Sequence, residues 1–438
     1  MTITPRLAPL VLLVLAGCVQ PPSMTGLETA ILAETTPPAR AKPALGETAF
    51  GQAITRAVSR SPSLDRSEAS LREAEAGLLA EGGGYLPRLS LGMSVPVTGG
   101  AHLYPFISLT QMLYDAGASR SRQAAARARA LGSLAGRQDV GNAAALTAIE
   151  TWGEVVLARG LMAVTGQTMS ELEKTAALIE DRANAGAGSS TEALTARSRL
   201  ANLRADWIAA QARVRRAETG FAVLFGDAPP ARIALPPRAP AAPVAALADS
   251  PLMLVAEAEL LAAQADLSAA QAARVPSLSA VGSAVRRTDG VTAGLESEYQ
   301  LAPGNRRAAS VAAAQARVAG REASREATRR DIDNRLAVLR TERIAARDQL
   351  TAAQEAQSVT AENLAAMREQ FEIGGRSMLD LLDAQRESLE AELRLVSARH
   401  AVALLDYARL AATGDLLDAF GIVLPSPNAL LPKERSNS

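Results

Sequence analysis

Aromatic side chains make up only 3% of this 438-residue sequence, and alanine supplies much of its hydrophobic content. This composition is poor material for a thick globular core and favours long helices that pack closely side by side. Basic and acidic residues balance at 46 each, so the chain has no basic excess with which to bind nucleic acid. Cys18 is the only cysteine, which excludes internal disulfides and cysteine metal clusters. With two histidines and no phosphate-binding loop, we expect neither catalysis nor a cofactor.

Long apolar runs are also missing. Beyond the N-terminus no stretch reaches the roughly 18 apolar residues that a membrane-spanning helix needs, so we expect any membrane crossing to use strands. At the N-terminus, a basic region and an apolar run over residues 7–15 precede Leu-Ala-Gly-Cys, which ends at Cys18. This order resembles the lipobox of bacterial lipoproteins and predicts a signal peptide over 1–17 and a covalent lipid on Cys18. The alternative is a buried thiol in an uncleaved segment. Val19 stands where lipoproteins of the inner membrane typically carry Asp, which favours the outer membrane.

An internal repeat runs through the sequence at an offset of about 188 or 189 residues. The matched pairs are Ser61-Pro62 with Ser250-Pro251, residues 86–90 with 275–279, residues 186–189 with 374–377, and Gly226-Asp227 with Gly414-Asp415. The near-constant offset indicates two copies of one unit, over 45–227 and 250–420. A Pro-rich linker over 228–249 joins them, and 18–44 and 421–438 form an N-terminal linker and a C-terminal tail.

Each copy is predicted to contain a helix, a strand hairpin and two long helices. In the first copy a helix over 47–79 is followed by glycines, and then strict alternation begins, with Leu89, Leu91 and Met93 on one face and Ser90 on the other. The predicted strands cover residues 88–97, 103–114, 277–286 and 291–301. Strands of about ten residues with one apolar face are typical of outer-membrane barrels. The alternative is a small periplasmic sheet with one wet face.

The long helices are the larger feature. No proline occurs from Ser119 to Arg182, so a helix there extends on the order of 90 Å. Apolar residues then recur at spacings of three and four in both copies, which predicts coiled-coil seams over 200–224 and 389–410. His400 lies in the second seam, where we expect a hydrogen bond to a neighbouring helix. The sequence predicts a mainly α fold with a small transmembrane β part.

Three motifs suggest a family. Residues 371–385 read FEIGGRSMLDLLDAQ, which resembles the signature of TolC-like outer-membrane efflux and secretion proteins, and LPRLS at 86–90 and QMLYDAG at 111–117 are similar to that family too. The resemblance covers residues 45–420. It implies a homotrimer in which four strands per chain close one twelve-stranded β-barrel and the helices form an α-barrel across the periplasm. Independently of it, four strands cannot close a membrane barrel, since the smallest have about eight. One departure is LAPGN at 301–305, where we expect a local change between strand and helix.

The resemblance implies a passive exit duct in the outer membrane that docks onto a periplasmic adaptor protein and an inner-membrane transporter. The second-copy motif is close to members that serve type I protein secretion, whereas a lipid anchor is common among drug and metal efflux members. Both cargo classes therefore stay open. The alternative function is a periplasmic coiled-coil adaptor or structural lipoprotein without a pore.

The resemblance also implies a gate at the periplasmic tips, in the turns over 186–190 and 374–377. Asp380 and Asp383 share one helix face, and acidic residues at these positions ring the narrow entrance in the family. Arg376 and Glu192 match positions whose cross-helix ion pair helps to hold it shut.

Phe371 stands where family members often carry tyrosine, so we expect one hydrogen bond of this gate to be absent. The alternative is that the tip charges are only a solvated helix face. Glu296 and Glu298, on the polar face of the last predicted strand, are the acidic candidates for the barrel lumen.

Overall fold

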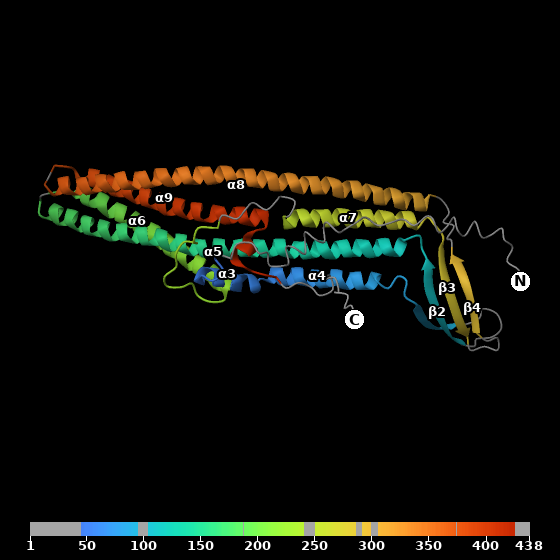
Figure 1. The fold of residues 1–438 in the computed structure, drawn as a ribbon. Coiled ribbons are helices and arrows are strands. Elements are labelled where there is room, and N and C mark those ends of the chain that lie inside the picture. Colours follow the sequence, from blue (N-terminus) through green and yellow to red (C-terminus); the bar gives the residue numbers. More distant parts are fainter. Residues whose placement is uncertain are drawn as a thin grey trace.

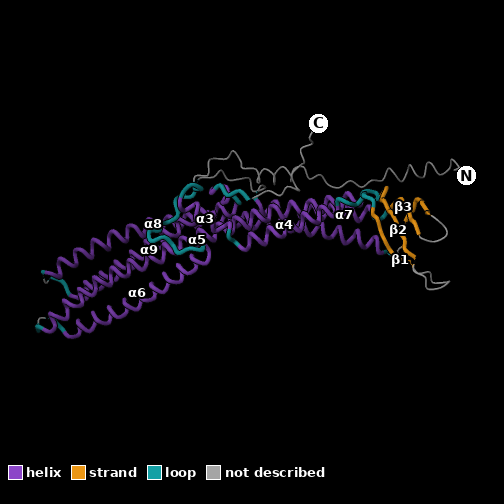
Figure 2. Tube along the Cα trace, turned by 90° about the horizontal axis from the view of Figure 1, so that it is seen from below, coloured by secondary structure: helices purple, strands orange, loops and turns teal. Residues whose placement is uncertain are grey.

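The structure, a computed structural model, is an elongated bundle of helices with a small sheet at one end (Figure 1). It describes residues 45–94, 104–186, 188–240, 250–285, 291–298, 305–373 and 375–424. Cys18 and the predicted signal peptide lie outside these residues. Seen from below, the helices run along the length of the molecule, away from the sheet (Figure 2).

The two copies have nearly the same order of elements. The first contains α3 (Ala49–Ser59), α4 (Pro62–Glu81), β1 (Arg88–Ser94), β2 (Tyr104–Tyr114), α5 (Ala118–Asn184) and α6 (Ser190–Phe225). The second contains α7 (Pro251–Ala272), β3 (Ser277–Val285), β4 (Val291–Glu298), α8 (Arg306–Glu372), α9 (Met378–Thr413) and the short α10 (Leu416–Phe420). Both α5 and α8 have 67 residues, or about 100 Å, and both α6 and α9 have 36. These equal lengths confirm the predicted duplication and the mainly α fold.

One predicted helix is in fact two. The single helix expected over 47–79 is wrong, because α4 begins anew at Pro62. Proline has no amide hydrogen and its ring clashes with the carbonyl four residues earlier, so it stops a helix but suits the first helical position. The corresponding helix of the second copy also begins at a proline. There α7 begins at Pro251, and the side chain of Ser250 accepts a hydrogen bond from the Met253 amide at 3.3 Å.

The four strands form one antiparallel sheet in the order β1-β2-β3-β4, so the pairing of β2 with β3 joins the two copies. The turns of both strand hairpins, residues 95–103 and 286–290, lie outside the described residues. Gly92 pairs with Phe106, and a Cβ atom at Gly92 would lie 2.5 Å from the aromatic ring. Only glycine therefore lets this ring cover β1.

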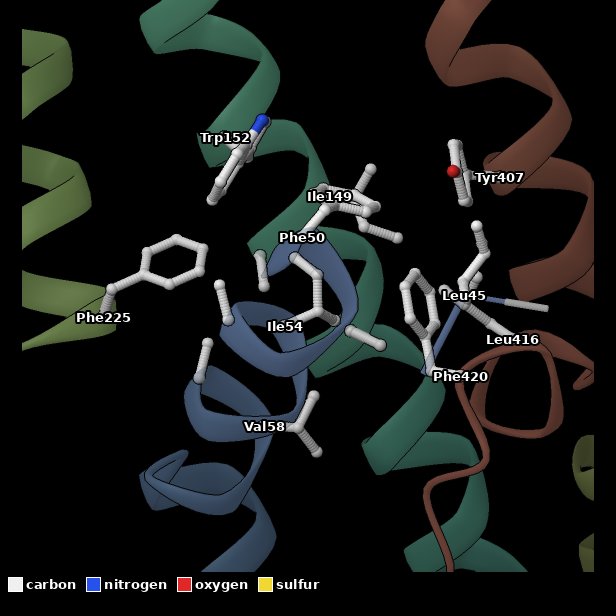
Figure 3. Packing of buried hydrophobic residues seen from close by; sticks show 14 of the residues in the cluster. Leu45, Phe50, Ile54, Val58, Ile149, Trp152, Phe225, Tyr407, Leu416 and Phe420 are labelled. Atoms are coloured by element: carbon white, nitrogen blue, oxygen red, sulfur yellow. The ribbon is translucent and has the colours of Figure 1, made fainter. Parts of the chain in front are cut away.

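A compact aromatic cluster interrupts the otherwise alanine-rich packing (Figure 3). Its members are Phe50, Trp152, Phe221, Phe225, Tyr407 and Phe420. The rings of Phe50 and Trp152 meet edge to face at 5.2 Å between centroids, while Phe221 and Phe225 stack at 4.0 Å. Such pairs add about 0.5–1.5 kcal/mol beyond their buried area. The low aromatic content therefore still yields one dense core, where α3 meets α5, α6, α9 and α10.

The Pro-rich linker is tied to this core. The indole N–H of Trp152 donates a hydrogen bond to the carbonyl of Ala234 at 2.9 Å, and the hydroxyl of Tyr407 donates to that of Pro237 at 2.6 Å. Side chains from the long helices of both copies thus fix the first part of the linker.

Candidate functional site

The two turns predicted as gate tips lie together at the end of the molecule farthest from the sheet (Figures 1 and 2). We use "tips" for residues 185–189, between α5 and α6, and 373–377, between α8 and α9. Gly186 has a φ of +74°, a left-handed conformation that favours glycine. Ser189 and Ser377 then cap the helices that follow. Residues 187 and 374 lie outside the description.

Two of the predicted gate acids close capping boxes. Glu192 accepts a hydrogen bond from the amide of Ser189 at 3.4 Å, and Asp380 accepts one from the amide of Ser377 at 3.3 Å. An acid at this position satisfies a free amide and interacts favourably with the positive end of the helix dipole. Each acid therefore has a structural role at the start of its own helix.

The third predicted acid connects the two helical hairpins. Arg199 on α6 donates from Nη2 to Oδ1 of Asp383 on α9 at 2.9 Å. Both side chains are partly exposed, so the pair contributes at most about 1 kcal/mol. No pattern in the sequence points to Arg199, because its ion pair exists only once α6 and α9 lie side by side.

Arg376 lies in the second tip, and Phe371 lies just before it, near the end of α8. Arg376 donates from Nε to the side-chain oxygen of Gln370 at 3.0 Å, within its own turn. The ion pair of Arg376 with Glu192 stays a prediction, since in this single chain both side chains bond within their own turns. Phe371 is buried, and the guanidinium carbon of Arg182 lies 4.8 Å from the centre of its ring. This cation–π contact joins α5 to α8.

Further polar contacts connect the hairpins beyond the tips. Arg368 on α8 pairs with Glu171 on α5, and the amide of Gln385 on α9 donates to the hydroxyl of Thr175 on α5 at 3.3 Å. These polar contacts surround an apolar cluster that the two hairpins share, in which Leu172 and Leu203 of the first hairpin pack with Leu382 of the second.

At the other end, one face of the β1–β2 pair is apolar and uncovered. The exposed side chains are Leu89, Leu91, Met93, Ile107, Leu109 and Leu113, with exposed fractions from 47% to 73%. Leu89 pairs with Leu109 and Leu91 with Ile107 across the strands, which confirms the predicted alternation. A contiguous apolar surface of this kind marks contact with lipid or with another protein.

The two lumen candidates lie in the last strand. The backbones of Glu296 and Glu298 belong to β4 and pair with Ser279 and Ser277. Their side chains lie outside the description, so their place in a lumen stays a prediction.

One buried carboxylate lies in the passage from β2 to α5. After β2, Asp115 accepts hydrogen bonds from the hydroxyl of Tyr85 at 2.6 Å and from the amides of Gly117 and Ser119 at 3.1 and 2.7 Å. Burial alone would raise the pKa of Asp115, but these hydrogen bonds outweigh it and lower the pKa. Residues 299–304 before α8 lie outside the description, so the local change expected at 301–305 stays a prediction.

A charged groove lies between α5, α6 and α9. In it, Glu154 accepts hydrogen bonds at 2.9 and 3.3 Å from Arg213. His400 packs so closely on α5 that a Cβ atom at Gly153 would lie 3.0 Å from its Nε2. Burial lowers the pKa of His400, and the charge of Glu154 opposes this while that of Arg213 adds to it. The hydrogen bond expected for His400 is not found at Nε2, which is buried without a partner among the described residues.

Within the described ranges, no three His, Cys, Asp or Glu side chains are grouped to hold a metal ion. Among the helices of these same ranges, none is both long enough and apolar enough to cross a membrane.

Comparison with known proteins gives one consistent picture. A family model described as outer membrane efflux protein matches residues 53–227 and 242–412. The chain is 24% identical over 393 residues to the outer membrane efflux protein BepC of Brucella suis, covering 85% of this chain and 86% of that protein. The fold is similar to that of a membrane protein from Pseudomonas aeruginosa, with a TM-score of 0.75 at 19% identity over 86% of this chain and 100% of the other. It is also similar to the CmeC outer membrane channel of Campylobacter jejuni, with a TM-score of 0.74 at 15% identity over 84% and 86%.

Proposed function

This chain belongs to the outer membrane efflux protein family, and from that premise we propose that three copies form a passive exit duct through the outer membrane. The observation that carries the proposal is the open sheet, whose outer strands β1 and β4 each have an edge without a partner in the described part of the chain. Four strands cannot close a membrane barrel, since the smallest have about eight. If β4 of each copy pairs with β1 of the next, three copies give twelve strands and leave no free edge.

In this arrangement the apolar sheet face contacts outer membrane lipid, and the long helices form a tube across the periplasm. The tips then dock onto a periplasmic adaptor protein and an inner-membrane transporter, which supplies the energy. The family consists of channels rather than enzymes, so the duct itself needs no cofactor. Cys18 carries a lipid that adds a second attachment to the membrane.

The cargo is a protein in type I secretion, or a drug or metal ion in efflux. The motif over 371–385 supports secretion, whereas the lipobox at Cys18 supports efflux. Deletion of the gene distinguishes the two cargo classes. If the cargo is a drug or metal ion, the deletion strain becomes more sensitive to it. If the cargo is a protein, that protein stays in the cell and is missing from the medium. The type of transporter encoded by the neighbouring genes also bears on the cargo, because a transporter with an ATP-binding cassette and a proton-driven pump predict different cargo.

The second hypothesis is a periplasmic adaptor lipoprotein without a pore. Adaptors usually carry one helical hairpin flanked by β-rich domains. The described residues instead contain two long hairpins that share a single four-stranded sheet.

The tips form the gate of the proposed duct. Asp380 and Asp383 of three copies converge near the axis, and Arg376 and Glu192 help to hold the entrance closed. Carboxylates grouped on an axis favour cations and are blocked by multivalent ones. We therefore expect a cation-selective channel of low conductance.

Single-channel recording of the purified protein in planar bilayers tests this gate. Asp380→Ala combined with Asp383→Ala should remove the block by trivalent cations, and Arg376→Ser should raise the conductance by loosening the entrance. Asp331→Ala combined with Asp333→Ala, which removes two exposed acids of α8 away from the tips, is the matched control and should keep the block. Unchanged block in the tip variant would instead favour a constriction at Glu296 and Glu298. Absence of any conductance would contradict the duct.

A further inference from the structure

The long helices nearest the tips form one layer, in the order α6, α5, α9 and α8. Figures 1 and 2 show α6 and α8 on opposite sides of α9. Only six of the 67 residues of α8 are buried, whereas α5 has the same length, a neighbour on each side and 27 buried residues. The two edge helices therefore each keep a side that the described part of the chain does not cover.

The uncovered side of α8 carries a second set of small and apolar side chains. They recur at spacings of three and four, as in a coiled-coil seam, and at about 100° per residue they lie opposite the buried Ala346 and Ala353. Two of them, Ile344 and Val359, are 59% and 58% exposed. We use "α8 stripe" for the exposed residues Ala337, Thr341, Ile344, Asp348, Ala352, Glu355 and Val359.

The uncovered side of α6 has the same rhythm. Leu194 and Ile208 on it are 64% and 53% exposed, and this side lies opposite the buried Val214 and Phe221. We use "α6 stripe" for Leu194, Ser198, Ala201, Ala205, Ile208, Ala212 and Arg215, of which only Ala212 is partly buried. A helix with one covered seam and one uncovered seam has the pattern of a helix that packs between two partners.

The two stripes carry opposite charges at the same height above the tips. Arg215 lies 25 residues from the start of α6 and Asp348 lies 24 residues from the end of α8, so both are about 37 Å from the tips. Within the described residues, neither side chain forms an ion pair. Helix α6 has six arginines and three acids, whereas residues 341–372 of α8 have six acids and three arginines. The charges of the two edges are therefore complementary.

We propose that α8 of one copy packs along α6 of the next copy, and that Asp348 of the first copy pairs with Arg215 of the second. This seam rests on the proposed ring of three copies. Because the stripes lie on opposite edges of the layer, the contact is head-to-tail, and a closed ring leaves neither stripe exposed. The two helices are antiparallel, since α6 leads away from the tips and α8 leads toward them.

The ion pair gives this seam its register. Small side chains let two helices approach closely, but a row of similar small residues defines their axial shift only weakly. Charged residues of a coiled coil set its partner and orientation, and here one arginine and one aspartate at the same height fix the shift.

Disulfide cross-linking in the outer membrane tests the seam. Arg215→Cys combined with Asp348→Cys should link each chain to its neighbour on mild oxidation and give a covalent trimer on a denaturing gel without reductant. Each single variant should remain monomeric on the same gel. Arg216→Cys combined with Asp348→Cys is the matched control, because Arg216 lines the charged groove beside His400, on another face of α6.

Charge reversal tests the ion pair itself. Arg215→Asp places two acids opposite each other and should lower the amount of heat-resistant oligomer roughly tenfold. Adding Asp348→Arg to the same chain makes the charges opposite again and should return the oligomer to the wild-type level. Rescue of this kind separates a lost contact from a misfolded chain.

The seam is overturned if the cysteines at 215 and 348 stay unlinked in an assembled oligomer, or if the control links equally well. It is also overturned if Arg215→Asp has no effect or if Asp348→Arg does not rescue it. An oligomer that assembles and conducts without the cross-link rules out the seam and leaves the proposed duct intact. Failure of the wild type to form any oligomer contradicts the duct and the seam together.

Discussion

At His400 the imidazole ring packs against the backbone of α5 because Gly153 opposite it has no side chain. Burial lowers the pKa of this histidine, so folding favours the neutral ring. The charged groups that line its groove are Glu150 and Glu154 from α5 and Arg213 and Arg216 from α6. The unfolded chain takes up a proton near pH 6.5, so the stability gained from a neutral His400 is present above about pH 6.5 and is lost as the pH falls toward the folded pKa.

We therefore expect His400→Gln to reduce the loss of thermal stability that the protein shows as the pH falls. Between about pH 7.5 and 5.5 the wild-type melting temperature should fall by more than that of the variant, because only the wild type must keep a buried imidazole neutral. Thermal unfolding at the two pH values measures the difference. Equal falls in both proteins would show that His400 does not contribute to acid sensitivity.

Gly92 is a second position where the absence of a side chain matters. Gly92→Ala places a Cβ atom 2.5 Å from the ring of Phe106 and should cost about 1–3 kcal/mol per chain through overpacking. Gly282→Ala, in β3 of the same sheet, meets nothing within 4 Å and serves as the control. Quantifying assembled protein in outer membrane fractions should show a loss for Gly92→Ala alone. Rescue by adding Phe106→Ala would assign the loss to this contact.

At the scale of elements, the middle of the β1–β2 pair places leucine and isoleucine on one face and serine on the other, and Phe106 lies on the serine face opposite Gly92. The cross-strand pairs Leu91 with Ile107 and Ser90 with Ser108 follow this division. Side chains alternate between the two faces of a strand, so the sequence predicts which residues share a face. The antiparallel register then places residues of the same kind in β1 and β2 opposite each other.

This division predicts opposite outcomes for neighbouring substitutions. Leu91→Arg puts a charge on the proposed lipid face and should cost roughly 2–4 kcal/mol per chain near the middle of the membrane, whereas Ser90→Arg points toward the lumen and should be tolerated. The amount of heat-resistant oligomer in outer membrane fractions measures both. Similar defects in the two variants would mean that the faces are assigned wrongly.

At the scale of the whole molecule, an elongated chain with an open sheet needs copies of itself. Each copy exposes two strand edges and one apolar face, which a membrane and two neighbours would cover. The predicted lipid on Cys18 would then be a second means of holding the chain in the membrane, besides the strands.

Replacing that cysteine separates the two attachments. Cys18→Ser should abolish acyl labelling yet leave assembled trimer in the outer membrane, because four strands per chain hold each copy there. Membrane fractionation with chemical cross-linking measures both properties. Complete release of the variant from the membrane as a monomer would argue against the barrel.

The sequence by itself determined the features that depend on neighbours along the chain. The duplication, the long proline-free helices and the alternation of Leu89 and Leu91 follow from residue spacing, which fixes period and face before any tertiary contact forms. The break at Pro62 also has a local cause, because proline suits the first position of a helix but not its interior.

Only the tertiary structure decided which helices touch. The ion pair of Arg199 with Asp383 joins residues 184 positions apart, and the contact of Arg182 with Phe371 likewise joins the two copies. The aromatic cluster arises in the same way. A local pattern states which face of a helix is apolar, but not which partner covers it, because that depends on the rotation and axial shift of one long helix against another.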